Sequence, residues 1–441
     1  MGQVVCFGPY DGWNGRMQLL VKAALAALAL TLVATPPAEA KRPRRHNVAP
    51  APVAPQPPGP QDIKFAQFIQ DFRTTALAAG ITPATYDLAM SGLHRAASIE
   101  GLNASQPEFV KPIWNYLDSA VSSTRVADGR RKLAENAGVL ATIEAKYGVP
   151  AEILVSIWGN ETDFGRGNGE FNIFQALATL AYDGPRAEFG KTELLNALKM
   201  LQQERLDPKQ MTSSWAGAFG QLQMLPSTFL KSAVDGDGDG KRDLWNSSAD
   251  ALASAAVEVS TDGWERGHGW GYEVRLPPDF PYELANGDLL KTVTDWGRLG
   301  VRTIDNRVMP IDLEQATIII PAGRRGPAFL TFNNFKVILK YNFAISYALA
   351  VCTLADQIAG RPGIFNPWPR DEQPLSRDER VAMQNALVKL GYPLDKIDGV
   401  LGRGTRAQLR IYQKTRGLPA DGFPTMALLA AILTEVKQKG L

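Results

Sequence analysis

The stretch GVPAEILVSIWGNETDFG, residues 148–165, decides how the rest of the chain is interpreted. Pro150 is suited to the first turn of a helix, where its missing N–H costs nothing, and the glycine that closes the stretch is suited to ending one. Ile153, Ile157 and Glu161 recur at every fourth residue, so a helix places them on one face. The stretch therefore predicts a helix that carries one carboxyl group on its apolar side.

The expected surroundings of Glu161 suggest a chemical use for this group. Desolvation on the buried side of a helix raises the pKa of a carboxyl, so we expect the group to stay protonated near neutral pH. A protonated carboxyl of this kind can serve as a general acid in the cleavage of a glycosidic bond. The alternative is an ordinary helix-end glutamate paired with Arg166, and the stretch alone favours that alternative.

The composition is that of an ordinary globular protein without a strongly charged partner. The chain has 441 residues, of which 45% are hydrophobic and 21% charged, enough for two or three domains. The formal net charge of +2 and the short basic cluster at residues 41–45 argue against a nucleic-acid partner. The three histidines, His46, His94 and His268, are scattered, which argues against a histidine-based metal site or catalytic triad.

The first 40 residues have the pattern of a secretory signal. A basic residue precedes an apolar run at residues 23–34, and an Ala-x-Ala site ends at Ala40, so we expect export to the periplasm and cleavage after Ala40. Met17 is the predicted start. The apolar run is too short for a comfortable membrane span. The cleavage point has no cysteine, so we expect no lipid anchor. Residues 41–60, rich in Pro and Ala, are predicted to be a disordered spacer.

The two cysteines are Cys6 and Cys352. Since Cys6 lies in the segment predicted to be removed, Cys352 has no partner within the mature chain and we predict no intrachain disulfide. In an apolar helix, Cys352 is more typical of a small core residue than of a nucleophile.

Residues 61–360 are predicted to form one mainly helical domain. Helical patterns are expected at residues 65–72, 81–90, 109–132, 135–147, 176–181, 191–204, 250–259, 289–299 and 335–351. Residues 316–321 and 329–332 have the pattern of a small β-hairpin. The stretch at 213–227 is rich in small residues and holds two glutamines and an aromatic, which suits the floor of a sugar site and equally a close-packed turn.

The acidic stretch DGDGDGKRDLWN, residues 235–246, is typical of a calcium loop. Acidic residues at the first, third and fifth positions with Gly at the sixth match the roughly 12-residue loop of EF-hands. The predicted Ca²⁺ ligands are Asp235, Asp237, Asp239, the backbone carbonyl of Lys241, and Asn246. Because Asn246 replaces the usual bidentate Glu, we expect a weaker or more open site with a structural role. The alternative is an acidic turn without metal.

Taken together, these stretches resemble the lytic murein transglycosylase B family over about residues 65–360. The motifs are GNETDFG at 159–165, WAGAFGQLQ at 215–223 with the following Pro226-Ser227, the acidic loop with LWN at 244–246, and YN at 341–342. The resemblance implies a lysozyme-like catalytic domain. It also implies cleavage of the β-1,4 bond between N-acetylmuramic acid and N-acetylglucosamine in peptidoglycan, without net addition of water. It favours the catalytic interpretation of Glu161.

Carried over by motif, the resemblance makes Glu161 the general acid and then the base. The residues that it places along the glycan cleft are Ser214, Gln223, Tyr341, Asn342, Tyr347, Arg186 and Met224. Ala187 stands where a second Arg is expected, and Met224 stands where an aromatic is often found, so the chain departs from the family pattern at both subsites. The tyrosines also suit plain core packing.

The chemistry fits the small number of candidate carboxyl groups. Ordinary glycosidases need two carboxylates flanking the bond, and the sequence offers one convincing candidate. Glu161 can protonate the leaving oxygen and then take the proton of the muramoyl 6-hydroxyl, which closes a 1,6-anhydro ring. The substrate supplies the nucleophile, so catalysis needs no cofactor. Asp163 falls on a different helix face and is a poor second carboxylate.

Residues 376–441 are predicted to form a small three-helix domain after a proline-containing linker at 361–375. The turns DGVLG at 398–402 and LPADG at 418–422 are placed as in the peptidoglycan-binding type 1 module, which this segment resembles over about 376–435. The resemblance implies a domain that holds the protein on the cell wall and raises the local substrate concentration. The alternative is any small helical domain.

Three functions are compatible with the sequence. The first is an exported lytic transglycosylase, a monomer without a stable membrane anchor or nucleic-acid partner, acting on peptidoglycan glycan strands. The second is a non-catalytic scaffold that binds the wall through both domains. The third is a hydrolytic muramidase, which requires a second carboxylate near Glu161.

Overall fold

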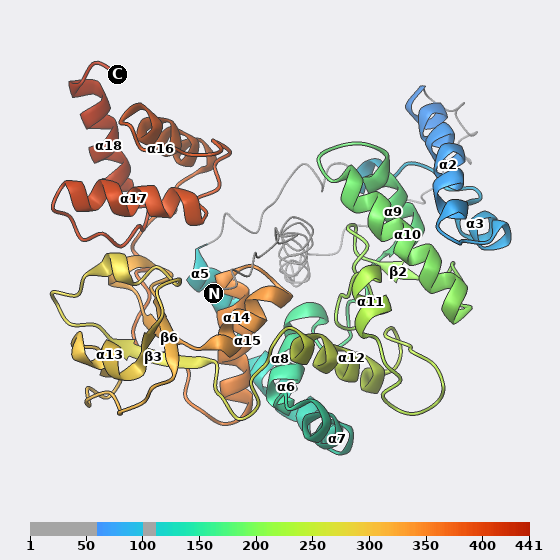
Figure 1. The fold of residues 1–441 in the computed structure, drawn as a ribbon, viewed down its shortest axis with the longest axis horizontal. Coiled ribbons are helices and arrows are strands. Elements are labelled where there is room, and N and C mark those ends of the chain that lie inside the picture. Colours follow the sequence, from blue (N-terminus) through green and yellow to red (C-terminus); the bar gives the residue numbers. More distant parts are fainter. Residues whose placement is uncertain (1–59, 100–111) are drawn as a thin grey trace, which may run out of the picture.

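The computed structural model describes residues 60–99 and 112–441 (Figure 1). The predicted signal region, almost all of the predicted spacer, and Cys6 lie outside the described residues. Helices dominate the described part, so the predicted mainly α fold class is confirmed. A small antiparallel sheet and a C-terminal group of three helices accompany the main helical body in Figure 1.

The helices of the main domain follow the chain from α2 to α15. They are α2 (Pro60–Ala78), α3 (Pro83–Met90), α5 (Ile113–Ala120), α6 (Ser123–Glu135), α7 (Ala137–Tyr147), α8 (Ala151–Thr162), α9 (Ile173–Tyr182), α10 (Ala187–Glu204), α11 (Pro226–Ser232), α12 (Ser248–Thr261), α13 (Val293–Arg298), α14 (Asn333–Tyr341) and α15 (Ile345–Ile358). The strands are β1 (Phe171–Asn172), β2 (Thr212–Ser213), β3 (Gly271–Arg275), β4 (Lys291–Thr292), β5 (Arg302–Thr303), β6 (Gln315–Ile319) and β7 (Ala328–Thr331).

Helix α8 lies in the core of the main domain. Gly148 ends α7 in the left-handed region at φ +74°, and Pro150 stands directly before the first turn of α8. Every residue from Ile153 to Thr162 is buried, because α6, α7, α12 and α15 pack around the helix. The helix is thus apolar and buried all round, and not on one face only. It ends at Thr162, three residues before Gly165.

Two segments predicted as single helices are each divided. The segment at 109–132, whose first residues lie outside the described part, contains α5 and α6, and Ser122 Oγ accepts a hydrogen bond from the Arg125 N–H at 3.3 Å to start α6. The segment at 335–351 contains α14 and α15, bent by 116° about the extended residue Asn342. Apolar periodicity runs through both breaks, so it did not predict them.

Helix α15 is the apolar centre of the domain. Within the described residues no single helix is long and apolar enough to cross a membrane, and only the bent pair of α14 and α15 passes that test, by length and composition alone. Most of α15 is buried inside the domain. Cys352 lies in α15 and is a buried core residue, as predicted.

The sheet is larger than the predicted hairpin. Strands β6 and β7 form that antiparallel hairpin, with Thr317 opposite Thr331, but they are the middle of a five-stranded sheet in the order β4-β6-β7-β3-β5. The helix predicted at 289–299 is only the six-residue α13, since Lys291 and Thr292 form strand β4. Strands of two residues carry too little alternation to be recognised in a sequence.

The C-terminal domain contains α16 (Arg377–Lys389), α17 (Arg403–Thr415) and α18 (Met426–Gln438). A capping box at Ser376 starts α16. Three polar contacts join this domain to the sheet region of the main domain. They are Lys414 Nζ to Glu283 Oε1 at 2.8 Å, Arg403 Nη2 to Asp288 Oδ1 at 2.9 Å, and the Arg324 N–H to Asp421 Oδ2 at 3.1 Å.

Candidate active site

Glu161 lies in the last turn of α8, with only 4% of its surface exposed. The hydroxyl of Tyr347, from α15, donates a hydrogen bond of 2.6 Å to Oε1 of Glu161. The two residues that the sequence assigned to one site therefore meet, although 186 residues separate them in the chain. A hydrogen bond to a carboxyl group from a fixed donor holds that group in one orientation.

Tyr341 lies directly beside Tyr347. Their rings stack almost in parallel, with centroids 6.4 Å apart, and the Tyr341 hydroxyl donates a hydrogen bond of 2.8 Å to the carbonyl oxygen of Leu222. Burial and then the charge of Glu161 raise the pKa of the Tyr347 hydroxyl well above its usual range. Burial, followed by the charges of Glu258 and Glu161, does the same to the pKa of Tyr341. Both hydroxyls thus remain protonated hydrogen-bond donors at neutral pH.

The sequence did not single out Tyr116 of α5. Its hydroxyl is buried and has no hydrogen-bond partner within residues 60–99 and 112–441. Burial and then the negative charge of Glu161 raise the pKa of Tyr116. The sequence showed only that Tyr116, a residue with a polar hydroxyl, stands in the apolar run around Ile113. Tyrosines of this kind are common in core helices, so the pattern does not identify a site residue.

A cavity of about 630 Å³ opens beside these tyrosines. Tyr116, Asn342 and Tyr347 line its wall in the main domain, and Arg403, Arg406 and Arg410 line it in the C-terminal domain. The cavity therefore leads from the tyrosine that holds Glu161 to the three-helix domain. Its size is typical of a ligand-binding site.

Arg166 does not support the ion-pair alternative for Glu161. Its guanidinium contacts Asp163 at 2.7 Å and Asp128 at 3.0 Å. Asp163 also lies 3.7 Å from Arg125, so this carboxylate is held in an ion-pair network at the end of α8. The network explains why Asp163, two residues after Glu161, is a poor second catalytic carboxylate.

The loop at 220–224 packs against the end of α8. The Thr162 hydroxyl donates a hydrogen bond of 2.6 Å to the carbonyl oxygen of Gln221. Gln223 has a left-handed backbone, with φ +48°, and its amide donates to the carbonyl oxygen of Gly220 at 3.1 Å. Met224 is fully buried in the hydrophobic core, and its predicted contact with the glycan stays a prediction. A local motif does not tell a core side chain from one on a cleft wall.

Ser214 and Arg186 belong to a neighbouring cluster around Trp215. The Arg186 guanidinium lies over the Trp215 ring at 5.2 Å from its centroid, and the residue is 8% exposed. The hydroxyl of Ser214 accepts a hydrogen bond from the Ala218 N–H at 3.2 Å. Neither contact places these two residues beside Glu161, so their predicted contact with the glycan stays a prediction.

The acidic loop includes a ligand candidate that the sequence did not indicate. Carboxylate oxygens of Asp235, Asp237 and Asp250 all lie within 4.8 Å of one another. Asp250 is 1% exposed and accepts hydrogen bonds of 2.7 Å from the Gly236 and Asp243 N–H groups. It lies beyond the 12-residue template, where the sequence indicates only the start of a helix. An all-oxygen donor set of this kind fits a hard cation such as Ca²⁺.

Two further predicted calcium ligands, Asp239 and Asn246, form hydrogen bonds inside the loop. Asp239 Oδ1 accepts a hydrogen bond of 2.8 Å from the Lys241 N–H. The Asn246 side chain donates one of 2.9 Å to Asp243 Oδ2. The structure thus groups two of the predicted ligands, Asp235 and Asp237, with Asp250, and Asp239 is not part of that group.

A buried carboxyl group held by a tyrosine on a mainly helical domain defines an acid–base catalytic site of the kind that acts on sugars. The transglycosylase SLT domain family matches residues 64–356, and a putative peptidoglycan binding domain matches residues 376–432. The chain belongs to the transglycosylase SLT domain family. Both resemblances predicted from the motifs are confirmed.

The known relatives agree with this assignment. Membrane-bound lytic murein transglycosylase B of Escherichia coli is 34% identical over 221 residues, which cover 48% of this chain and 58% of that protein, less than two thirds of its length. SltB3 of Pseudomonas aeruginosa, solved with NAG-NAM-pentapeptide and with NAG-anhNAM-pentapeptide, is 44% identical, with a TM-score of 0.81 over 83% of this chain and 99% of SltB3. Lytic transglycosylase Slt35 of E. coli, solved with calcium, is 28% identical, with a TM-score of 0.57 over 68% of this chain and 93% of Slt35.

Proposed function

We propose that this protein is a periplasmic lytic transglycosylase that cleaves the β-1,4 bond between N-acetylmuramic acid and N-acetylglucosamine in peptidoglycan. Its products carry 1,6-anhydromuramoyl ends. The observation that carries the proposal is the buried carboxyl of Glu161, held by the Tyr347 hydroxyl at 2.6 Å next to a cavity that reaches the C-terminal domain.

The proposed reaction needs one carboxyl group. Glu161 donates its proton to the glycosidic oxygen, the bond from that oxygen to the anomeric carbon breaks, and N-acetylglucosamine leaves with a free 4-hydroxyl. The carboxylate then takes the proton of the muramoyl 6-hydroxyl, whose oxygen bonds to the anomeric carbon. Glu161 is protonated again at the end, and no water is consumed. Tyr347 positions Glu161 in both steps.

Two structures of one relative, SltB3, support the substrate and the product. SltB3 has been crystallised with a disaccharide pentapeptide and with the corresponding anhydro compound. The anhydro sugar is the kind of product that the proposed reaction yields, and SltB3 is similar to this chain over both domains. The chain's own peptidoglycan-binding domain supports glycan strands as the partner of the full protein.

The hydrolytic alternative has one specific candidate for a second carboxylate. Glu258 of α12 is buried, and its charge acts on Tyr341 as that of Glu161 does. Neither Glu161 nor Glu258 lines the cavity, but Tyr347, which lines it, donates its hydroxyl hydrogen bond to Glu161. The scaffold alternative gives no reason for a buried glutamate held by a tyrosine donor, because a buried carboxyl group without a chemical role costs stability.

Export, assembly and calcium complete the proposal. The signal pattern at residues 1–40 supports export to the periplasm, and we propose that the exported protein acts as a monomer. Catalysis uses no cofactor. Asp235, Asp237 and Asp250 would hold a structural Ca²⁺ that fixes the loop leading into α12, and Slt35 has been solved in complex with calcium.

The test is the digestion of purified sacculi, followed by mass spectrometry of the released muropeptides. We expect anhydro-ended products from the wild type and at least about a hundredfold loss in Glu161→Gln. Glu152→Gln is the matched control, since Glu152 lies in the first turn of the same helix and pairs with Arg361 at 3.2 Å. Reducing ends would show hydrolysis and direct attention to Glu258. Binding to sacculi without any products would support the scaffold.

A further inference from the structure

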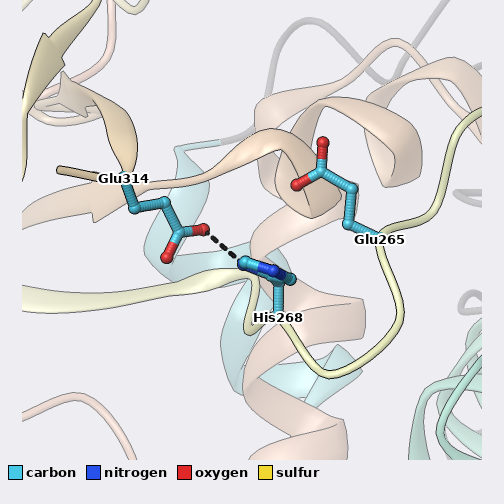
Figure 2. A group of neighbouring side chains, drawn as sticks. All are labelled: Glu265, His268 and Glu314. Carbon is cyan, nitrogen blue, oxygen red and sulfur yellow. Dashed lines mark hydrogen bonds and ion pairs between the residues drawn. The ribbon is translucent and has the colours of Figure 1, made fainter.

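We propose that Glu265, His268 and Glu314 form a second metal site, for a divalent first-row transition ion such as Zn²⁺ (Figure 2). One potential ligand atom of each residue lies within 4.8 Å of the other two. His268 Nδ1 and Glu314 Oε1 are 3.1 Å apart. The scattered positions of the histidines in the sequence argued against a histidine-based metal site. In the folded chain, however, the carboxylates of Glu265 and Glu314 lie beside His268.

The loop after α12 supplies two of the three ligands. Glu265 and His268 are three residues apart, and the His268 N–H donates a hydrogen bond of 3.2 Å to the Glu265 carbonyl oxygen. Gly267 makes this turn possible with φ +80°. Arg266, which lies between the ligands in sequence, turns its guanidinium to the carbonyl oxygen of Ala145, 2.7 Å away. The two ligand side chains thus come from one tight turn.

A buried asparagine at the start of α14 fixes this turn. Asn334 is 0% exposed, and its Oδ1 accepts a hydrogen bond of 2.7 Å from the Glu265 N–H. Its Nδ2 donates to the carbonyl oxygens of Glu265 at 3.0 Å and His268 at 2.8 Å. Because the backbone of Glu265 and His268 is already held, a metal that binds them has to order only their two side chains, which favours binding.

Glu314 comes from the other side, directly before β6, as Figure 2 shows. Its N–H donates a hydrogen bond of 2.8 Å to Asp312 Oδ1, and its carbonyl oxygen accepts one of 3.1 Å from the Val293 N–H. Its backbone is therefore also fixed. A metal here would join the loop after α12 to the sheet, and so would connect the helical body with the sheet region.

The donor set selects the class of metal. Zn²⁺ binds imidazole nitrogen and carboxylate oxygen at roughly 2.0–2.2 Å, which places tetrahedral ligands about 3.3 Å apart. Small side-chain rotations would bring three atoms already within 4.8 Å to that spacing. A neutral imidazole and two carboxylates balance a divalent charge, and the nitrogen ligand favours a transition metal over Ca²⁺ or Mg²⁺. Water would take the fourth position, since His268 is half exposed.

The test uses the mature chain in excess Ca²⁺, which occupies the acidic loop. Co²⁺ is titrated with visible absorption as the readout, and Zn²⁺ is then added as a competitor. We expect one tight ion per chain, displaced by Zn²⁺, and a rise of several degrees in melting temperature with Zn²⁺. His268→Gln should weaken binding at least tenfold and remove the rise, and His94→Gln, at the other described histidine, should leave both unchanged.

A second variant keeps the result independent of folding defects. Glu314→Gln removes a ligand from the sheet side and preserves the size of the side chain, so it should also weaken binding at least tenfold. Absence of tight Co²⁺ or Zn²⁺ binding by the wild type would overturn the proposal. Binding of unchanged affinity in a folded His268→Gln or Glu314→Gln protein would overturn it as well, because the metal would then lie elsewhere.

Discussion

The Tyr347 hydroxyl bonds to Glu161 Oε1 at 2.6 Å and so links α15 to the end of α8. The same two helices are linked nearer the start of α8, where the Ser156 hydroxyl donates a hydrogen bond of 2.6 Å to the carbonyl oxygen of Val351. Since both helices are buried over most of their length, the acid is held by the rigid core of the domain. The orientation of the Glu161 carboxyl is therefore a property of core packing.

Tyr347→Phe should lower kcat/KM by roughly ten- to a hundredfold, because a hydrogen bond to an ionised group contributes about 1.5–3 kcal/mol. Loss of the donor disfavours the carboxylate, so the pH–rate profile should also move to higher pH. Tyr86→Phe is the control, since Tyr86 is a buried tyrosine whose hydroxyl bonds to the Ile69 carbonyl oxygen, away from the site. An unmoved profile in Tyr347→Phe would contradict a positioning role.

The thiol of Cys352 should be unreactive in the folded protein. Burial and then the nearby Asp356 raise the pKa of this thiol well above its usual range, so the reactive thiolate is scarce even at mildly alkaline pH. In the chain that begins after Ala40, iodoacetamide should label Cys352 only after denaturant is added, as followed by intact mass. Rapid labelling of the native protein would show that α15 opens readily.

Gly323→Ala should loosen the contact between the two domains. Gly323 has φ +66°, and a Cβ there would lie 2.6 Å from Phe423 Cβ and 2.8 Å from Asp421 Oδ2, both in the C-terminal domain. Gly391→Ala is the control. Gly391 has φ +89°, and a Cβ added to it would have no neighbour within 4 Å among the described residues, so this variant introduces the strain of an alanine at positive φ without a steric clash. Small-angle scattering should show a larger radius of gyration for Gly323→Ala only. Equal radii of gyration for the two variants would show that the contact between the domains accommodates the added methyl group and would contradict the prediction.

Ca²⁺ should stabilise the protein through Asp237 and not through Asp239. At a concentration about a hundred times the dissociation constant, a bound ion adds about 2.7 kcal/mol, or a few degrees in melting temperature. We expect Asp237→Asn to abolish this increase and Asp239→Asn to retain most of it, because only Asp237 belongs to the close group with Asp235 and Asp250. If Asp239→Asn abolished the increase and Asp237→Asn retained it, the Asp235, Asp237 and Asp250 group would not be the calcium site.

Much of the fold and part of the site follow from local sequence. The helix that carries Glu161, the acidic loop and the three C-terminal helices are each marked by residues close together in the chain. Tyr347 was placed with Glu161 only through the family resemblance, because no local pattern links positions 186 residues apart. For the same reason Asp250 was not recognised as part of the acidic group.

The sequence failed where contacts override local pattern. The apolar run at 335–351 continues through the bend that separates Tyr341 from Tyr347. His268 meets Glu314 across 46 residues, so the proposed metal site depends on tertiary structure alone.

In the proposed reaction Glu161 uses the substrate's own hydroxyl and not water. The most direct measurement is digestion of sacculi in water enriched in the heavy oxygen isotope, with mass spectrometry of the muramoyl ends. We expect products one water lighter than reducing ends and free of the heavy isotope, and their loss in Glu161→Gln. Muramoyl ends that carry one heavy oxygen would show that water attacks the anomeric carbon and would contradict the proposed mechanism.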